Sequence, residues 1–576
     1  MIDYDSLRNL PEAFFDEARK RAAEPFLWSK TTGDWRSIDW GETAARVSDL
    51  SRGLRELGVA TGDRVAIVLE NRPEWFIADL AIMAAGAISV PAYTTNTVED
   101  FFHILADSGA KLAIVSSADL AERVVPAAVR APETEIVVTM DAAPADAQGV
   151  RMIAWDDVLE LGQAARDDTA ARVATIARTD TCCIIYTSGT GGRPKGVMLS
   201  HGAILCNCRG AYELLRPLPD FSIGGEGFLS FLPLSHSYEH TAGMIFPMTI
   251  GAQIYYAQSM DRLVANMAEA RPTIMTAVPR LYEIIHGRIV SGVQQAGGLK
   301  EKLFMKALEL GRRRIDSGAP LSGLAGLMDW ILERLVRDKV RQRFGGRLQA
   351  FVSGGAPLNP EIGGFFLALG VRILQGYGQT ESAPVISCNP VHGVRIDTVG
   401  PPLAGVEVKI AEDGEILARG ELLMQGYWNN PDATAEVLRD GWLHTGDIGE
   451  LDPDGFLRIT DRKKDIIVNS GGDNLSPQRI EGMLTIEPEI LQAMVHGDRR
   501  PYLVALIVAD AEHGGDIGEA VRRVNAKLGN IERIRHFVAA DEPFTTDNEM
   551  MTPSLKIRRH VIRAKYGDKL DALYGG

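Results

Sequence analysis

Apolar residues between positions 62 and 115 alternate between short continuous runs and helical spacing. Short runs rich in valine, isoleucine and leucine are typical of buried strands, and apolar residues three or four positions apart are typical of helices. The pattern predicts strands at 64–69, 88–90 and 112–115, and helices at 75–85 and 98–108. Because strands that alternate with helices of this length form parallel β-α-β units, we predict an α/β fold for this part of the chain.

Between positions 299 and 344 the pattern becomes long and helical. Six apolar residues fall on one predicted face: Leu327, Ile331, Leu335, Val336, Val340 and Phe344. Gly345-Gly346 ends this helix. Most of the other positions are basic: Arg334, Arg337, Lys339, Arg341 and Arg343. A solvated helix face explains these basic residues, and contact with anionic lipid is the alternative.

A domain boundary is predicted near Asp461 to Asp465. A strand at 455–459 precedes it, and the sequence after it contains a new strand at 502–507 and a new helix at 518–528. We therefore predict a large N-terminal domain at 1–461 and a small C-terminal domain at 462–576. The segment 141–148 is rich in Ala, Asp and Pro, which indicates a surface connection.

Composition limits the class of protein. The net charge of −15 argues against nucleic-acid binding, which needs a basic surface. The five cysteines have neither an even disulfide count nor a C-x-x-C zinc spacing, which favours a reduced cytoplasm. The apolar stretch 80–93 is too short to span a bilayer. The first residues lack the basic-then-apolar order of a signal peptide.

The segment 186–196 carries the strongest chemical signal. An apolar run at 182–185 opens into a turn that is rich in hydroxyls and glycines and contains Lys195. Such a turn offers backbone N–H groups, hydroxyl donors and a mobile positive charge to a polyanion. Pro194 before the lysine and Gly196 after it exclude the common P-loop, and the dinucleotide G-x-G-x-x-G pattern is absent. The turn therefore predicts a nucleotide triphosphate site of another kind.

This turn resembles the phosphate loop of the adenylate-forming enzymes, a superfamily that includes acyl-CoA synthetases. The resemblance implies an adenylate-forming fold, in which parallel and mixed sheets with helices form the large domain and a mobile α+β domain follows. It implies that the following residues hold the ATP phosphates: Thr187, Ser188, Gly189, Thr190, Gly191 and Lys195. Gly191 replaces the usual second threonine of the loop, so weaker ATP contacts are expected.

Two further motifs follow in the order that this superfamily uses. The first, 353–358, is similar to the adenine-binding segment, and Gly355 and Ala356 are its expected contacts. The second, 375–381, implies that Gln375, Gly376 and Tyr377 line the adenine site, with Tyr377 stacked on the ring. Thr380 is expected to bind the α-phosphate. Glu381 and Thr187 are the expected ligands of Mg²⁺, which prefers oxygen donors.

The resemblance extends to the C-terminal motifs. Asp447 and Arg462 are expected to bind the ribose, and Lys556 to bridge the substrate carboxylate and the α-phosphate during adenylation. Lys464 is the expected hinge, and Gly471-Gly472 the backbone beside the pantetheine arm of CoA. Related aryl-CoA ligases carry lysines at two positions of this segment, where this chain has Val468 and Ser470. The expected catalytic residues are Lys556, Lys195, His236 and Thr380.

The segment 232–240 is similar to the wall of the carboxylate and acyl site. His236 is expected near the adenylate and Tyr238 at the acyl entrance, whereas His240 is interpreted as structural. Gly378 stands where acetate-activating relatives carry a pocket-filling tryptophan, which implies a deep acyl pocket. The apolar segment 244–248 is explained equally well by a tunnel wall and by core packing.

The segments 337–358, 71–75 and 90–93 resemble long-chain fatty acyl-CoA synthetases in particular, within a resemblance that runs from about 44 to 559. The leading hypothesis is a ligase that uses ATP, Mg²⁺ and CoA to activate a long-chain fatty acid. The alternatives are an enzyme that loads a carrier protein, a ligase for a medium-chain or other acid, and a binding module without catalysis. A cytoplasmic location is expected, and peripheral contact with the inner face of the membrane and a homodimer are left open.

Overall fold

The computed structural model describes residues 2–141, 147, 149–187, 193–471, 473–511, 514–545, 548–552 and 557–574. The chain divides into two compact units. The first contains 1–187, 194–407 and 418–443, and the second contains 188–193, 408–417 and 444–576. Most of the predicted surface connection at 141–148 lies outside the described residues.

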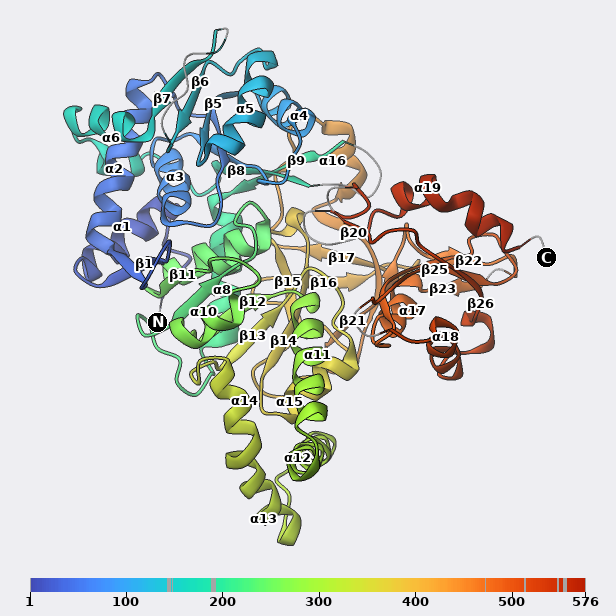
Figure 1. The fold of residues 1–576 in the computed structure, drawn as a ribbon. Helices are drawn as coiled ribbons and strands as arrows, with labels where there is room; N and C mark the ends of the chain where they lie inside the picture. The colour runs from blue at the N-terminus through green and yellow to red at the C-terminus, as the bar shows by residue number, and fades with distance from the viewer. Residues whose placement is uncertain are drawn as a thin grey trace. The chain divides into compact units, whose positions relative to one another are not determined.

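One eight-stranded sheet of the first unit contains all the strands predicted between 64 and 115 (Figure 1). Its order is β18-β9-β8-β4-β3-β5-β6-β7. The strands are β3 Arg64–Val68, β4 Ile88–Pro91, β5 Ala110–Val115, β6 Ile136–Thr139, β7 Arg151–Ala154, β8 Thr181–Thr187, β9 Lys195–Ser200 and β18 Gly426–Tyr427. The β3, β4, β5, β6 and β7 strands pair in parallel, whereas β9 is antiparallel to β8 and to β18. The predicted parallel β-α-β units are confirmed.

A second eight-stranded sheet has the order β15-β14-β13-β12-β10-β11-β1-β2. Its strands are β1 Pro25–Ser29, β2 Arg36–Asp39, β10 Gly227–Ser230, β11 Gln253–Tyr256, β12 Ile274–Ala277, β13 Ala350–Ser353, β14 Ile373–Gly378 and β15 Val385–Cys388. The strands β10, β12, β13 and β14 are parallel neighbours, and β15 is antiparallel to β14. Both sheets are therefore mixed, as predicted.

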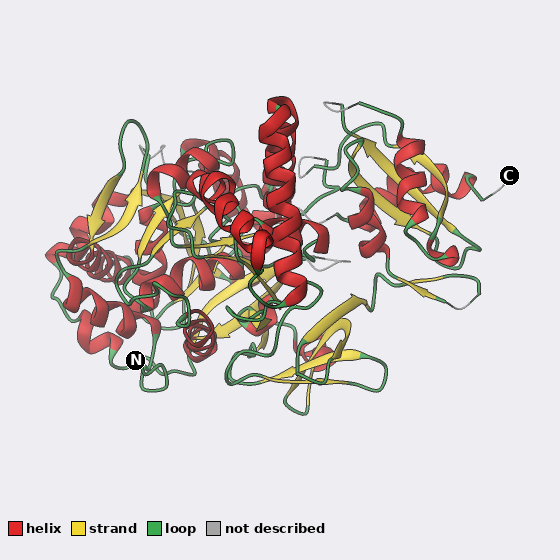
Figure 2. Ribbon diagram, turned by 90° about the horizontal axis from the view of Figure 1, so that it is seen from below, coloured by secondary structure: helices red, strands yellow, loops and turns green. Residues whose placement is uncertain are grey.

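Helices surround these strands in the first unit (Figure 2). They are α1 Leu10–Arg21, α2 Trp40–Glu56, α3 Pro73–Ala84, α4 Val98–Ser108, α5 Ala118–Arg130, α6 Trp155–Ala164, α7 Thr169–Val173, α8 His201–Leu215, α9 Phe246–Thr249, α10 Leu263–Ala270, α11 Pro279–Ala296, α12 Gly298–Ser317, α13 Gly323–Leu332, α14 Asp338–Arg343, α15 Pro360–Ala368 and α16 Pro431–Val437. Two π-helical segments, η1 Glu239–Ile245 and η2 Glu333–Arg337, and the 3-10 segment η3 Thr380–Ser382 complete the set. The predicted helix at 98–108 matches α4, which begins at a Thr97–Asp100 capping box.

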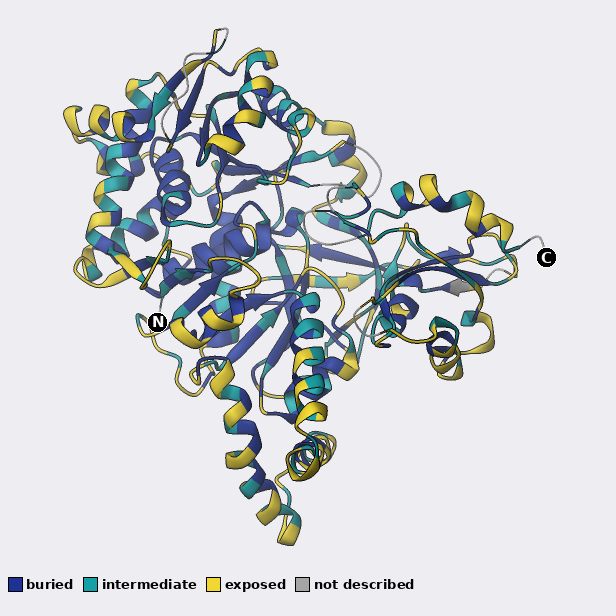
Figure 3. Cartoon of the chain, viewed as in Figure 1, coloured by how far each residue is buried: buried dark blue, intermediate teal, exposed yellow. Residues whose placement is uncertain are grey.

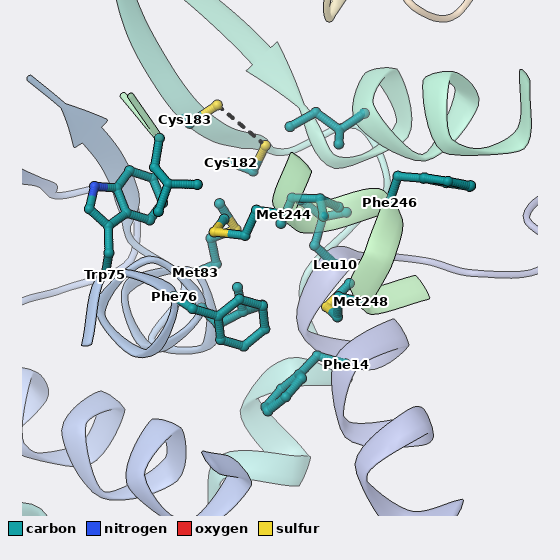
Figure 4. Packing of buried hydrophobic residues seen from close by; sticks show 14 of the residues in the cluster. Leu10, Phe14, Trp75, Phe76, Met83, Cys182, Cys183, Met244, Phe246 and Met248 are labelled. Carbon is teal, nitrogen blue, oxygen red and sulfur yellow. Dashed lines mark hydrogen bonds between the residues drawn. The ribbon is translucent and has the colours of Figure 1, made fainter. Parts of the chain in front are cut away.

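The apolar segment 244–248 belongs to the hydrophobic core. Met244, Phe246 and Met248 are at most 1% exposed and pack in the cluster that also contains Leu10 and Cys182 (Figure 4). Burial of this kind supplies about 25 cal/mol per Å² of apolar surface. Core packing, one of the two explanations left open by the sequence, therefore accounts for this segment.

The residues 298–343 form the helical arm of the first unit, made of α12, α13, η2 and α14 (Figure 1). Val336, Val340 and Phe344 are buried, as predicted. The prediction was wrong for Leu327 and Leu335, which are 56% and 47% exposed. A π-helix has more residues per turn than an α-helix. Because η2 interrupts the 3.6-residue spacing, residues before and after it do not share the face that uninterrupted spacing predicts.

Arg337 is fully buried at the base of the arm, so the interpretation of its side chain as part of a solvated face was wrong. Its Nη2 donates to Asp329 Oδ1 at 2.6 Å and to the Ala307 carbonyl at 2.8 Å. Its Nη1 donates to Glu333 Oε2 at 3.0 Å, and its Nε to the Ala368 carbonyl at 2.9 Å. These bonds tie α12, α13 and η2 to the end of α15. A buried guanidinium needs hydrogen-bond acceptors for its N–H groups, and each of these partners is an acceptor.

The second unit contains a three-stranded sheet of order β24-β25-β26. Its strands and helices are β22 Ile467–Val468, β23 Asn474–Leu475, α17 Pro477–Leu484, β24 Ile490–His496, β25 Leu503–Ala509, α18 Ile517–Ala526, η4 Asn530–Glu532, β26 Ile534–Ala539 and α19 Arg559–Ala572. A separate five-stranded sheet consists of β16 Glu407–Ile410, β17 Glu415–Arg419, β19 Leu438–Arg439, β20 Trp442–Leu451 and β21 Leu457–Arg462. The strand predicted at 502–507 and the helix predicted at 518–528 correspond to β25 and α18. The predicted domain boundary near 461 stays a prediction.

Among the described residues, none of the helices has both the length and the apolar character needed to cross a membrane.

Candidate active site

The parallel strands of the second sheet bring three predicted site segments to one edge. His236 follows β10, Gly355 follows β13, and Thr380 follows β14. Because β10, β12, β13 and β14 run in the same direction, the segments after them emerge at the same edge of the sheet. Ligands of open α/β sheets bind at this carboxyl edge.

Direct contacts join these segments. Ser237 Oγ lies 3.0 Å from Thr380 Oγ1, and both side chains are buried. A Cβ on Gly354 would lie 3.0 Å from the Tyr238 ring, so the glycine lets the β13 loop pack closely on this ring. Gly355 has φ of +84°, a conformation that glycine adopts without strain. The loops after β10, β13 and β14 therefore form one packed group.

Tyr238 is part of the support for this edge. Its hydroxyl donates to the Val352 carbonyl at 2.8 Å, and its ring is buried below Gly354. Burial raises the pKa of Tyr238 well above its usual value. Packing against β13 fixes the position of Tyr238, and its expected place at the acyl entrance stays a prediction. Its backbone N–H donates to His236 Nδ1 at 3.1 Å, which assigns the acceptor role to that ring nitrogen.

The described ends of the predicted phosphate loop are the last residue of β8 and the first residue of β9. Thr187 and Lys195 are partners in this antiparallel pair. A Cβ on Gly196 would lie 2.7 Å from Ile184 Cγ2 and 3.1 Å from the Tyr186 ring, so glycine is required beside the lysine. The turn between the strands, with Ser188, Gly189, Thr190 and Gly191, lies outside the described residues.

The helix α4 anchors this hairpin. Tyr186 OH donates to Asp107 Oδ2 at 2.6 Å, and Trp428 Nε1 donates to the Asp107 carbonyl at 2.9 Å. His103 Nε2 lies 2.8 Å from the Pro194 carbonyl. Burial and the hydrogen bond to Asp107 raise the pKa of Tyr186 well above its usual value, so its phenol is neutral. Both sides of the hairpin are thus fixed next to Lys195.

Tyr427 connects two predicted site residues, and the sequence did not reveal it. Its hydroxyl donates to Glu381 Oε1 at 2.8 Å, and Lys195 Nζ lies 4.9 Å from the centre of its ring. Burial and the charge of Glu381 raise the pKa of Tyr427 well above its usual value, so the phenol stays a donor. Tyr427 lies on β18, which pairs with β9 although more than 200 residues separate them in the chain. A glycine before two aromatic residues was the only local signal.

The donors present fit a magnesium ion bound to a triphosphate. Glu381 supplies a carboxylate whose orientation Tyr427 fixes, and Thr187 supplies a hydroxyl at the end of β8. Mg²⁺ prefers oxygen donors and is usually held by one or two carboxylates together with substrate phosphates. In the described part of the chain there is no group of three His, Cys, Asp or Glu side chains able to hold a metal on its own.

The remaining predicted adenine contacts lie on the same edge. Gly355 and Ala356 are exposed in the β13 loop. Gln375, Gly376 and Tyr377 belong to β14, and Tyr377 is only 8% exposed. Their contacts with a nucleotide stay predictions.

Gly378 does not leave room for a deep acyl pocket in the way the resemblance implied. A Cβ at this position would lie 1.8 Å from the Pro384 carbonyl oxygen and 2.9 Å from Val385 Cα. Both atoms are backbone, so a side chain here displaces β15 instead of filling a cavity. The glycine is explained by the close approach of β14 and β15.

The π-helical segment η1 follows His236 and buries two titratable side chains. His240 Nε2 lies 2.9 Å from Asp79 Oδ2 with both residues fully buried, so its structural interpretation is confirmed. Glu239 Oε2 accepts from Thr276 Oγ1 at 2.6 Å. Burial raises the pKa of Glu239 to about 7. A Cβ on Gly243 would fall 2.4 Å from this carboxyl carbon, so the glycine makes room for Glu239.

In the second unit, Asp447 and Arg462 form a pair. They face each other across β20 and β21, and Arg462 Nε donates to Asp447 Oδ1 at 3.0 Å. The preceding Gly446 has φ of +73°, and its N–H donates to Glu415 Oε1 at 2.9 Å. The two residues expected to bind a ribose therefore lie side by side, and their contact with a ribose stays a prediction.

The hinge and CoA predictions fall on exposed turns of the second unit. Lys464 is exposed in the turn after β21, where the Ile466 N–H donates to the Arg462 carbonyl at 3.0 Å. Gly471 is exposed, and its N–H donates to Asn469 Oδ1 at 2.9 Å. Gly472 and Lys556 lie outside the described residues. The roles of all four stay predictions.

A cleft of about 650 Å³ lies at the opposite, amino edge of the second sheet. It is lined by residues that immediately precede β10, β12, β13 and β14, among them Glu226, Thr273, Gln349 and Arg372. None of the predicted site residues lines it.

The family comparison agrees with this geometry. The AMP-binding enzyme family matches residues 14–428, and the AMP-binding enzyme C-terminal domain matches residues 464–576. The chain belongs to the AMP-binding enzyme family. The predicted class, an enzyme of the adenylate-forming superfamily, is confirmed.

Two individual relatives are similar to this chain over most of its length. The chain is 34% identical to the long-chain-fatty-acid–CoA ligase FadD15 of Mycobacterium bovis, over 94% of this chain and 93% of the relative. It is 30% identical to the peroxisomal long chain acyl-CoA synthetase 6 of Arabidopsis thaliana, over 94% of this chain and 82% of the relative.

Solved structures share the fold. The anthranilate CoA ligase AuaEII in complex with anthranoyl-AMP matches with a TM-score of 0.76 at 21% identity, over 98% of this chain and 99% of that one. The adenylation domain of a carboxylic acid reductase from Segniliparus rugosus, in complex with AMP, matches with a TM-score of 0.76 at 21% identity, over 99% and 94%. The adenylate-forming fold predicted from the sequence is confirmed.

Proposed function

We propose that this enzyme activates a long-chain fatty acid with ATP and transfers the acyl group to CoA. A carboxylate oxygen attacks the α-phosphorus and pyrophosphate leaves, which gives the acyl-AMP. The CoA sulfur then attacks the acyl carbonyl carbon and AMP leaves. The observation that carries the proposal is the convergence of Thr380, Ser237, Glu381, Tyr427 and Lys195 in the first unit. The names of the curated relatives support the substrate class.

In this proposal each side chain either binds the phosphates or offsets their charge. Lys195 and the hydroxyl-rich turn bind the phosphates, and Thr380 binds the α-phosphate through a hydroxyl that Ser237 positions. Glu381 and Thr187 would hold Mg²⁺, and a magnesium ion bound there would supply positive charge that offsets the charge of the phosphates. Lys556 offsets the repulsion between the carboxylate and the α-phosphate.

The proposal also gives roles to residues of the second unit. The Asp447–Arg462 pair binds the ribose, because a carboxylate accepts hydrogen bonds from ribose hydroxyls and the guanidinium holds the carboxylate in place. A turn at Lys464 changes conformation between the two steps, and Gly471-Gly472 then passes close to the CoA thiol arm. A cytoplasmic location is part of the proposal.

Pyrophosphate exchange with and without a fatty acid tests the first step, and a chain-length series tests the substrate class. We expect exchange that depends on long-chain acid and Mg²⁺, and acyl-CoA formation once CoA is added. Exchange that depends on short acids alone contradicts the substrate class. Adenylate formation without CoA transfer, together with loading of a carrier protein, supports the carrier-loading alternative instead. No exchange with any acid contradicts the proposed reaction.

A further inference from the structure

The helical arm exposes an unusual amount of apolar surface. Thirteen large hydrophobic side chains are exposed in the described part of the chain, and seven of them belong to this arm. They are Leu299, Met305, Leu324, Leu327, Met328, Trp330 and Leu335. Exposed hydrophobic residues are ordinary when scattered singly, but a concentration on one element marks a surface that is covered in use.

The concentration is highest at α13. We define the apolar tip as Leu324, Leu327, Met328 and Trp330, of which Leu324 is 87% and Trp330 59% exposed. Much of the ribbon of α13 carries the colour of exposed residues (Figure 3). Within α13 only Asp329 and Leu332 are buried, and Asp329 is held by Arg337. One side of α13 therefore packs against the protein, and the apolar tip faces solvent. Four large side chains that stay exposed gain little of the free energy that burial supplies, so another role explains them better than stability does.

The charge of the arm is opposite to that of the whole chain. Residues 298–343 contain eleven Lys and Arg against six Asp and Glu, whereas the chain carries a net charge of −15. Three of the six acidic residues, Asp329, Glu333 and Asp338, are bound to Arg337 or Arg341. Exposed basic residues flank the apolar tip in the sequence: Arg312 and Arg313 near the end of α12, and Arg334 directly after α13.

We propose that the apolar tip and its flanking arginines dock the enzyme on an anionic lipid surface. Leucine, methionine and tryptophan side chains enter the boundary between headgroups and acyl chains, and guanidinium groups bind the lipid phosphates. Arg334 already lies over the Trp330 ring at 5.2 Å, which places a cation beside the indole that inserts. Two such arms repel each other, so a pair of copies joined tip to tip is the weaker explanation.

Vesicle flotation of the full-length enzyme tests the proposal without relying on its activity. The probes are phosphatidylcholine vesicles with and without phosphatidylglycerol, each at physiological and at several-fold higher salt. We expect binding to the anionic vesicles that weakens with salt. The variant Leu324→Ser/Leu327→Ser/Trp330→Ser and the variant Arg312→Glu/Arg313→Glu should each lower the partition coefficient about tenfold or more.

Matched controls carry the same substitutions elsewhere. Ile223→Ser/Met260→Ser/Ile531→Ser removes exposed hydrophobic residues away from the arm, and Arg36→Glu/Arg262→Glu reverses exposed charges away from it. These variants should bind like the wild type, and all variants should melt at the wild-type temperature because the changed side chains are exposed. No flotation, or equal losses in the arm and control variants, would overturn the proposal. Dimerisation in sedimentation that the tip variant alone abolishes, without vesicle binding, would assign the tip to a second copy instead.

Discussion

The two edges of the second sheet of the first unit differ in how they use their polar groups. At the amino edge, a cleft of about 650 Å³ has charged walls, and two of the charged side chains, Arg372 and Glu226, bind backbone groups. Arg372 Nη1 donates to the Gln349 carbonyl at 2.9 Å, and Glu226 Oε1 accepts from the Ser222 N–H at 2.8 Å. Burial lowers the pKa of Arg372 and raises that of Glu226.

At the carboxyl edge the polar groups belong to side chains that hold one another in position. Ser237 meets Thr380, and Tyr427 joins Glu381 to Lys195. Such pairs keep donors and charges oriented, which is what a charged substrate requires. The arrangement of neighbouring polar side chains therefore identifies a site better than the volume of a cleft does.

The largest expected contrast concerns the cations. Lys195→Met should lower kcat/KM for adenylate formation about a thousandfold, because a charge beside the triphosphate is lost. Arg347→Met, at the lining of the amino-edge cleft, should change it less than about threefold. Pyrophosphate exchange measures both. Comparable losses in the two variants would erase the difference between the edges.

The carboxylates give the next contrast. Glu381→Gln should lower the rate about a hundredfold and raise the Mg²⁺ concentration needed for half-maximal exchange, because a neutral amide is a poorer ligand for a hard cation. Glu226→Gln is the matched variant at the other edge. It should leave the Mg²⁺ titration unchanged. An unaltered Mg²⁺ dependence in Glu381→Gln would remove this residue from the metal site.

A pH-dependent contrast comes from Glu239. Its pKa rises from 4.5 unfolded to about 7 folded, so its contribution to stability is complete below about pH 4.5 and is lost as the pH rises through 7. Glu239→Gln has no such loss. Its free energy of unfolding relative to the wild type should therefore increase by up to about 3 kcal/mol between pH 4.5 and 8.

Urea unfolding at a series of pH values measures this difference. Thr276→Val removes the hydroxyl that donates to the Glu239 carboxylate, so it should move the transition to higher pH. Parallel stability curves for the wild type and Glu239→Gln would show that this carboxyl does not titrate in the expected range.

The smallest effect is expected for the residue that the sequence missed. Tyr427→Phe keeps the ring near Lys195 but removes the hydrogen bond to Glu381. A hydrogen bond to a charged group contributes about 1.5–3 kcal/mol, so kcat/KM should fall at least about tenfold, with a larger loss at low Mg²⁺. Equal losses at all Mg²⁺ concentrations would indicate that Tyr427 supports the fold alone.

The parts of the fold that depend on local periodicity were predictable. The strands and helices between 64 and 115 could be predicted from apolar spacing alone. The face of the helical arm was not predictable, because the π-helical segment η2 interrupts the 3.6-residue period. The burial of Arg337 depends on carbonyls from α12 and α15, which no local pattern reveals.

In the candidate site, too, residues in contiguous motifs were predictable and residues that depend on distant contacts were not. The phosphate-loop lysine and the Thr380-Glu381 pair were recognisable because their motifs are contiguous. Tyr427 was not, because it reaches Glu381 through the pairing of β18 with the distant β9. Gly378 was misinterpreted, because the sequence does not show that its missing Cβ would meet the backbone of Pro384.

Photolabelling with an ATP analogue that carries an azide on the adenine ring tests most directly which edge binds the nucleotide. The full-length enzyme is irradiated with and without excess ATP, and the labelled residues are mapped by mass spectrometry. The account predicts ATP-protected labels at residues 354–358 and 375–381, at the carboxyl ends of β13 and β14. Protected labels at 219–226, 346–349 or 370–372 would place the nucleotide in the amino-edge cleft and contradict it.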